Sequence, residues 1–339
     1  MEPYYYNHMN KQQQSAYSAM KAGLLSLENT FTVPFLEGRE LSDIFFQLRL
    51  DFPGIFYVSG FQYRHYQGSS NIEMIPDYLF DKNKIKEHQK AMKARITKLA
   101  RPAEKMTEWE KEQYIHDFIC ANVRYDKLKK PYSHEIIGPL GQGVGVCEGI
   151  AKSVKALCDE LGIWCMIAVS DANPDKKIKY RHAWNIVRLS GNYYHLDVTF
   201  DNSLGREGTV RYDYFNLEDK QFFRDHEPVI YPAPSCGDGT RFYYKEKRLS
   251  FTKMEDVSKR ALQAIRKGKI LIFHWRGGYL TREVLTELLA ILEEAARQKE
   301  KYVKVSLNWP QAVLQAAFVE QVPEEEVTVE EANEGEAVH

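Results

Sequence analysis

Apolar residues recur at helical spacing in a stretch near the middle of the chain. From Cys147 onward they define one helix face, and they stand at Ile150, Ala151, Val154, Leu157, Cys158 and Leu161. Gly162 follows where a C-terminal cap is expected. A loop with glycine at every second position, 141 to 145, precedes the stretch and cannot propagate a helix. The pattern predicts a buried helix that begins at or near Cys147.

Beyond this helix the pattern becomes strand-like. Residues 163–169 form an apolar run rich in β formers, and the polar stretch 170–181 separates it from two further strands. Between those two strands, Ser190-Gly191-Asn192 is typical of a hairpin turn. A two-residue turn at Ser190-Gly191 would pair Leu189 with Asn192.

The loop length of this hairpin decides whether His182 and Asp197 can meet. With the two-residue turn, His182 faces Thr199, and Asp197 lies on the same face one diagonal step away. A four-residue loop sets His182 directly opposite Asp197. A three-residue loop without a bulge sets the two side chains on opposite faces, because a slip of one residue inverts every side chain.

Cys147, His182 and Asp197 together offer the chemistry of a thiol nucleophile. Such a thiol needs a base to take its proton and a third group to orient that base. Backbone N–H groups and the helix dipole at a first turn favour a thiolate. A buried carboxylate without a partner is costly, so Asp197 in an apolar strand is expected to have one. The three residues are therefore the predicted catalytic triad.

The other cysteines have simpler interpretations. Cys158 and Cys165 lie on apolar elements and are expected to be small buried hydrophobes. Cys236 stands in a stretch rich in proline and glycine, and it is expected to be an exposed thiol without a catalytic role.

Three segments of the chain resemble the core of the transglutaminase-like superfamily, a branch of the papain-like thiol enzymes. They are GVCEGIAKSVKALCDELGI, HAWNIV and YYHLDVTFDN, and the likeness extends over residues 107–230. It implies Cys147 as nucleophile, His182 as base and Asp197 as orienting group. Such domains include cross-linking transglutaminases, proteases, amidases and inactive scaffolds. Glu148 stands where animal transglutaminases have a tryptophan, which argues against glutamine–lysine cross-linking.

The expected fold is α+β, with a papain-like, transglutaminase-like core in which the Cys147 helix packs on an antiparallel sheet carrying His182 and Asp197. Residues 1–106 are predicted to form a helical and hairpin region that packs on this core. Residues 231–248 are predicted to be a connector, 249–319 a small α/β module, and 320–339 a disordered acidic tail.

Net charge and composition exclude several classes of function. The net charge of −1 conceals eight glutamates in residues 320–339, but no basic cluster is interleaved with aromatic residues, so no nucleic-acid partner is expected. No cysteine pair has the spacing of a zinc site, and neither a metal nor a cofactor is expected. The chain has no apolar run of ~18 residues and no apolar signal core, so we expect no membrane span and a cytoplasmic location.

The predicted reaction is acyl transfer from an amide bond of a peptide or protein through a Cys147 thioester. Hydrolysis by a peptidase or amidase is favoured over cross-linking, because water is abundant and no sequence motif indicates a binding site for a second, amine-bearing substrate. A peptide-binding scaffold without activity, and a protein-glutamine transglutaminase, are the alternatives. The Cys147 backbone N–H, Gln142 and Trp184 are candidates for oxyanion or substrate binding. The C-terminal module is a candidate for binding a protein partner.

Overall fold

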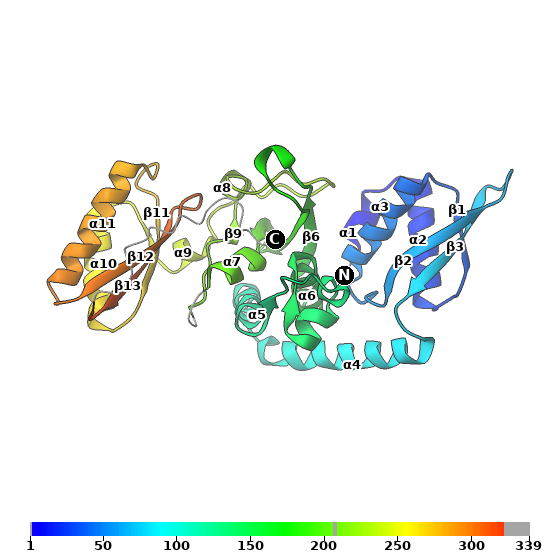
Figure 1. Ribbon diagram of the computed structural model, residues 1–339, viewed down its shortest axis with the longest axis horizontal. Helices are drawn as coiled ribbons and strands as arrows, with labels where there is room; N and C mark the ends of the chain where they lie inside the picture. Colours follow the sequence, from blue (N-terminus) through cyan, green and yellow to red (C-terminus); the bar gives the residue numbers. More distant parts are fainter. Residues whose placement is uncertain (1, 206–208, 322–339) are drawn as a thin grey trace. The chain divides into compact units, whose positions relative to one another are not determined.

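The computed structural model describes residues 2–205 and 209–321 of the protein (Figure 1). The chain divides into two compact units, of which the first comprises residues 1–211 and 227–235. The second comprises residues 212–226 and 236–339. The predicted acidic tail, from residue 322 onward, lies outside the described residues.

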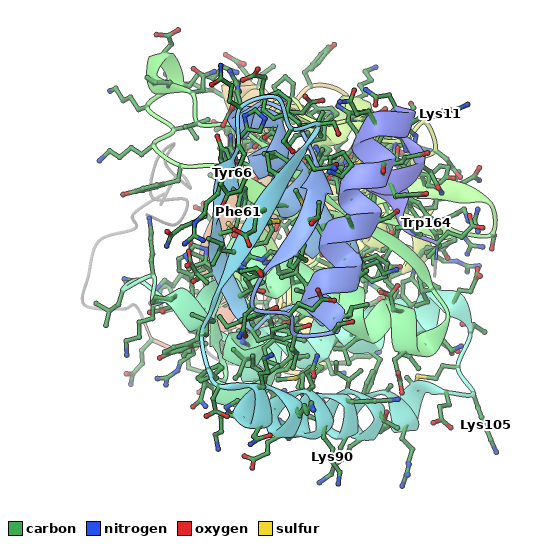
Figure 2. All side chains as sticks on the ribbon, turned by 90° about the vertical axis from the view of Figure 1, so that its right-hand side faces the viewer. Lys11, Phe61, Tyr66, Lys90, Lys105 and Trp164 are labelled. Atoms are coloured by element: carbon green, nitrogen blue, oxygen red, sulfur yellow. The ribbon has the colours of Figure 1, made fainter. Side chains whose placement is uncertain are left out.

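The N-terminal part of the first unit combines helices with a small sheet. Its elements are α1 (Tyr4–Asn7), α2 (Lys11–Leu25), β1 (Phe31–Pro34), α3 (Gly38–Asp51), β2 (Val58–His65), β3 (Asn71–Tyr78) and α4 (Lys82–Ala100). The three strands are antiparallel in the order β1-β3-β2, and α2 packs on β1 and α3. Figure 2 shows Lys90 on α4 pointing away from the body of the protein, and this lysine is exposed.

The rest of the first unit is built around α6 and an antiparallel sheet. Its elements are η1 (Arg101–Ala103), α5 (Glu108–Asn122), β4 (Arg124–Tyr125), η2 (Pro131–His134), η3 (Ile137–Gln142), β5 (Val144–Gly145), α6 (Cys147–Leu161), β6 (Trp164–Ser170), η4 (Pro174–Lys176), β7 (His182–Leu189), β8 (Asn192–Leu196) and α7 (Val198–Leu204). Strands β6, β7 and β8 are neighbours in that order, and α6 packs on β6 and β7. The predicted α+β core is thus confirmed.

The second unit is a small α/β module with additional segments before it. Its elements are β9 (Phe215–Leu217), α8 (Asp219–Phe222), α9 (Tyr243–Glu246), β10 (Ser250–Phe251), α10 (Met254–Arg266), β11 (Leu271–Trp275), α11 (Arg282–Arg297), β12 (Tyr302–Asn308) and β13 (Val313–Val319). The strand order is β10-β11-β13-β12, with β10 parallel to β11. Leucines of α11 and Phe273 of β11 belong to one buried core, as the leucine stripe predicted.

Of the three loop lengths that the sequence left open, the hairpin of β7 and β8 has the two-residue turn, but its strand pairing is shorter than that turn led us to expect. Leu189 pairs with Asn192, and both Ser190 (φ 50°) and Gly191 (φ 90°) have the positive φ of a type I′ turn. The pairing ends at Asn185 and Leu196, because α7 begins at Val198. The prediction that His182 faces Thr199 across the sheet was therefore wrong.

No helix in the described ranges, 2–205 and 209–321, is both long enough and apolar enough to cross a membrane.

Candidate active site

Cys147 is the first residue of α6, as the apolar pattern predicted. The extended residue before it, Val146, donates its N–H to the carbonyl of Ser133 (3.0 Å) and fixes the entry of the chain into the helix. Two residues after Cys147, only glycine fits at position 149, because a Cβ on Gly149 would lie 2.1 Å from the Ser133 carbonyl oxygen. Gly162 ends the helix in the left-handed conformation (φ 75°). The Cys147 N–H has no intrahelical acceptor, since it belongs to the first turn.

His182 and Asp197 meet at the end of the hairpin opposite its turn. His182 is the first residue of β7, and Asp197 is the N-cap of α7. The distance from His182 Nε2 to Asp197 Oδ2 is 2.5 Å, and the other carboxylate oxygen accepts the Phe200 N–H at 3.0 Å. The Asp197 side chain is fully buried, whereas 19% of the His182 side chain is exposed. Asp197 thus orients an imidazole that solvent can reach.

The environment of His182 favours its charged form. Burial lowers the pKa of the imidazole, but the negative charge of Asp197 and the hydrogen bonds to Asp197 and Cys147 raise it by more. The net result is a pKa of about 10 for His182. The structure thereby brings the three predicted site residues together, with a positively charged ring next to the Cys147 sulfur.

Trp184 and Gln142, the other predicted site residues, are placed differently from each other. Trp184 is buried, its ring is stacked on that of His182 at a centroid distance of 5.9 Å, and its N–H is donated to Nδ1 of His195 (3.0 Å). Gln142 is exposed at the last residue of the π-helical turn η3. Within the described part of the chain, no hydrogen bond joins Gln142 to the three clustered residues.

Tyr125 is a further residue at this site, and the sequence did not single it out. It is the last residue of β4, where it pairs with Gly145 of β5, two positions before the cysteine. Burial raises the pKa of its phenol, and the negative charges of Cys147, Asp126 and Asp197 raise it further. The hydroxyl therefore stays protonated and can donate a hydrogen bond. Its position depends on the β4–β5 pairing, which no local pattern indicates.

A buried cluster of charges holds the start of α6. Lys152 is fully buried and lies 2.7 Å from Glu148 and 2.8 Å from Glu135, which also pairs with Arg49. Burial raises the pKa of Glu148, but the Lys152 ammonium and the other positive charges lower it by more. Glu148, the residue after the cysteine, is therefore an anion within an ion-pair network.

Of the three cysteines assigned no catalytic role from the sequence, two are placed as expected and one is not. Cys158 and Cys165 are buried, as expected. Cys236 is also fully buried, so the prediction of an exposed thiol was wrong. The reason is local: its backbone N–H and C=O bond to Asp219, and these contacts draw the irregular segment inward.

A match to a known family covers the part of the chain that carries this site. Residues 91–198 match the family model described as the transglutaminase-like superfamily. One similar solved structure is described as a TGase (TM-score 0.26, 13% identity, 50% of each chain covered). Another is described as "a Putative Cysteine Protease from Cytophaga hutchinsonii" (TM-score 0.27, 17% identity), with 41% of this chain and 61% of that chain covered. The chain thus spans less than two thirds of either structure, and the comparison with curated proteins gave no match.

Proposed function

We propose that this protein is a thiol-dependent acyl-transfer enzyme that cleaves an amide bond of a peptide or protein, and the match of residues 91–198 to the transglutaminase-like superfamily model supports this. The observation that carries the proposal is the cluster of Cys147, His182 and Asp197, with a 2.5 Å contact between imidazole and carboxylate. A raised His182 pKa supports the same roles, because a charged ring stabilises a thiolate and can later protonate a leaving amine.

The proposed reaction has two steps. The Cys147 thiolate attacks the amide carbonyl, the C–N bond breaks, and His182 gives its proton to the departing nitrogen to leave a thioester. His182 then takes a proton from water, which attacks the thioester carbonyl and releases a carboxylic acid and the thiolate. Asp197 keeps the ring oriented and compensates its charge in both steps.

The oxyanion of each tetrahedral intermediate needs hydrogen-bond donors. We propose the backbone N–H of Cys147 as one donor, since first-turn amides have no intrahelical acceptor. The protonated phenol of Tyr125 is the second, supported by the influence of the Cys147 charge on its pKa. Gln142 remains a candidate, because it is exposed on the turn before β5.

Hydrolysis is favoured over cross-linking by the surroundings of Glu148. This residue occupies the position after the nucleophile, and its carboxylate is engaged with Lys152 (2.7 Å) and His134 (3.2 Å). The Glu148 carboxylate is therefore not free to bind the ammonium group of a second, amine-bearing substrate. Water needs no such site.

The test incubates the full-length protein with glutamine- and asparagine-containing peptides and follows new carboxylates and released amine or ammonia by mass spectrometry. A parallel reaction contains a primary amine. We expect carboxylate formation that disappears in Cys147→Ala and persists in Cys120→Ala, which removes the other half-buried thiol. In Tyr125→Phe, kcat should fall by about 10²-fold, the effect of losing one oxyanion donor.

The same panel distinguishes the alternatives. Incorporation of the amine in place of water would identify a transglutaminase. Peptide binding without turnover, by both the wild type and Cys147→Ala, would identify a scaffold and overturn the proposal.

A further inference from the structure

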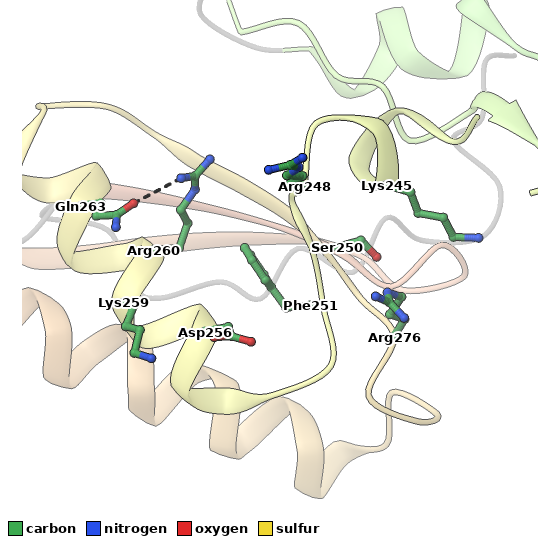
Figure 3. Close-up of a pocket in the computed structure, with 9 residues that line it drawn as sticks. All are labelled: Lys245, Arg248, Ser250, Phe251, Asp256, Lys259, Arg260, Gln263 and Arg276. Atoms are coloured by element: carbon green, nitrogen blue, oxygen red, sulfur yellow. Dashed lines mark hydrogen bonds between the residues drawn. The ribbon is translucent and has the colours of Figure 1, made fainter. Parts of the chain in front are cut away.

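The second unit contains a cleft of about 710 Å³ whose lining is strongly basic, here called the basic cleft (Figure 3). Five cationic side chains line it: Lys245, Arg248, Lys259, Arg260 and Arg276. Asp256 is the one carboxylate in this lining of described residues, so the cleft has a surplus of four positive charges. The volume lies within the range of about 300–1,000 Å³ typical of small-molecule sites.

Three parts of the α/β module line the basic cleft: one face of α10, the residue after β11, and the segment that contains Lys245, Arg248, Ser250 and Phe251. Asp256, Lys259, Arg260 and Gln263 stand at the i, i+3, i+4 and i+7 positions of α10 and form one face of it. Strands β10 and β11 are parallel, so their carboxyl ends lie at one edge of the sheet. Arg276 follows the last residue of β11 at that edge.

The cations of the basic cleft are not neutralised by the described part of the chain. Among the described residues, no carboxylate forms an ion pair with Arg248, Lys259 or Arg276, and Arg260 is hydrogen-bonded to the neutral Gln263 (3.2 Å). Lys245 donates to the Gly239 carbonyl at 2.8 Å. Elsewhere in the same unit, by contrast, Arg241 pairs with Glu246 at 2.8 Å.

The positive charge of the cleft lowers the pKa of a buried histidine beside it. His274 of β11 is hydrogen-bonded to Ser250 (2.8 Å), which lines the cleft. Burial lowers the pKa of His274, and the charges of Lys245, Arg224 and Arg276 lower it further, to about 3. The imidazole is therefore neutral, and its titration can report an anion that enters the cleft.

We propose that the basic cleft binds a small polyphosphate, an anion that carries several phosphate groups close together. Arginine presents a planar set of donors that matches phosphate oxygens in two-point contacts, and three of the five cations are arginines. The volume suits a small molecule, whereas a nucleic-acid strand needs a track with several stacking side chains along it. Phe251 is the one aromatic side chain in the described lining.

The experiment measures binding to the full-length protein by calorimetry at fixed ionic strength, with inorganic triphosphate, adenosine triphosphate and inositol hexakisphosphate as separate probes. The double variant Arg260→Gln/Arg276→Gln should weaken the binding of the preferred probe by about 100-fold, because each lost charge-assisted bond contributes about 10-fold. The control, Arg266→Gln/Lys267→Gln, removes two exposed charges from the end of α10 outside the lining and should change binding by less than about 3-fold.

The order of affinities identifies the source of the phosphates. Equal binding of inorganic triphosphate and adenosine triphosphate shows that phosphate groups alone are recognised. A preference for adenosine triphosphate shows that its nucleoside contributes, and a preference for inositol hexakisphosphate shows that the cleft favours more than three phosphate groups. Bound polyphosphate should also raise the His274 pKa, measured by NMR, because it offsets the charges that lower it. If the double variant fails to fold, Lys259→Gln replaces it, since Lys259 is exposed on the same helix face.

Three outcomes overturn the proposal. The first is that none of the three probes binds, and the second is an equal loss of binding in the control and the double variant. The third is tighter binding of a single-stranded oligonucleotide than of any small probe, which would assign the cleft to nucleic acid.

Discussion

At the scale of single residues, the position of His182 between a carboxylate and a thiol dominates the site. Its ring keeps contact with solvent, while Asp197 is fully buried and has partners for both carboxylate oxygens. The grouping of Cys147, His182 and Asp197 was predicted from the order of the three residues along the chain, but the place of Asp197 at the start of α7 was not, because the sequence pattern continues the strand through it. Tyr125 could not be found in this way, because its strand has only two residues and pairs with β5.

The raised His182 pKa predicts how stability depends on pH. The pKa of an unfolded histidine is about 6.5, and that of His182 in the folded protein is about 10. The folded state therefore holds the proton more tightly, and the stabilisation is fully present below pH ~6.5 and lost as the pH rises through about 10. Chemical denaturation at several pH values should show that the gap in unfolding free energy between wild type and His182→Gln narrows over this window. A gap that stays constant up to pH ~10 would contradict the assignment.

At the scale of elements, the short helix α7 carries the orienting carboxylate. Its N-cap is Asp197, and one turn later Asp201 lies 3.1 Å from His116 of α5, with both side chains fully buried. Burial lowers the pKa of His116, but Cys120, Asp117 and Asp201 raise it by more, so the imidazole is charged. This ion pair fixes α7 on α5 and thereby the position of Asp197.

Removal of the His116 cation should therefore affect both stability and catalysis. His116→Ala leaves Asp201 buried without this partner charge, and such a loss costs about 3–5 kcal/mol of unfolding free energy. In the fraction that remains folded, kcat should fall while KM changes little, because the proposed role of Asp197 is to orient His182 and not to bind substrate.

The matched control for this prediction is His134→Ala. His134 also pairs with a carboxylate, Glu148, but 41% of its side chain is exposed, so its removal should cost less than about 1 kcal/mol. Equal unfolding midpoints for the two variants would show that α7 does not depend on His116.

The elements also show where local sequence patterns succeed and where they fail. Helix α6 and the β7–β8 turn were predicted because each is defined by its own residues: an apolar stripe with Gly162, and Ser190-Gly191. The end of β8 was not, since residues 197–200 have strand-forming composition. The strand ends before these residues, because the Asp197 side chain accepts a hydrogen bond from the Phe200 N–H and caps a helix that begins at Val198.

At the scale of the whole molecule, the second unit includes a segment that the sequence alone assigned to the core. Residues 212–226 belong to this unit, in which Asn308 of β12 donates to Asp213 at 2.9 Å and Gln311 donates to Asp225 at 3.1 Å. These partners are 95 and 86 residues apart, so no local pattern reveals them. The predicted domain boundaries, with a connector at 231–248, stay a prediction that truncated chains can test.

A chain that ends after Lys247 tests this organisation. This chain lacks Asn308 and Gln311, so the carboxylates of Asp213 and Asp225 each lose a hydrogen bond. Removal of such a buried partner lowers the free energy of unfolding by about 1–3 kcal/mol. We expect limited proteolysis with mass mapping to cut within residues 212–226 of this shortened chain. A chain that ends after Gln321 keeps every described element and should remain protected at residues 212–226. In the chain of 339 residues, Asn308→Ala should lower the unfolding free energy by about 1–3 kcal/mol. Protection of residues 212–226 in the chain that ends after Lys247 would mean that this segment is stabilised without the α/β module.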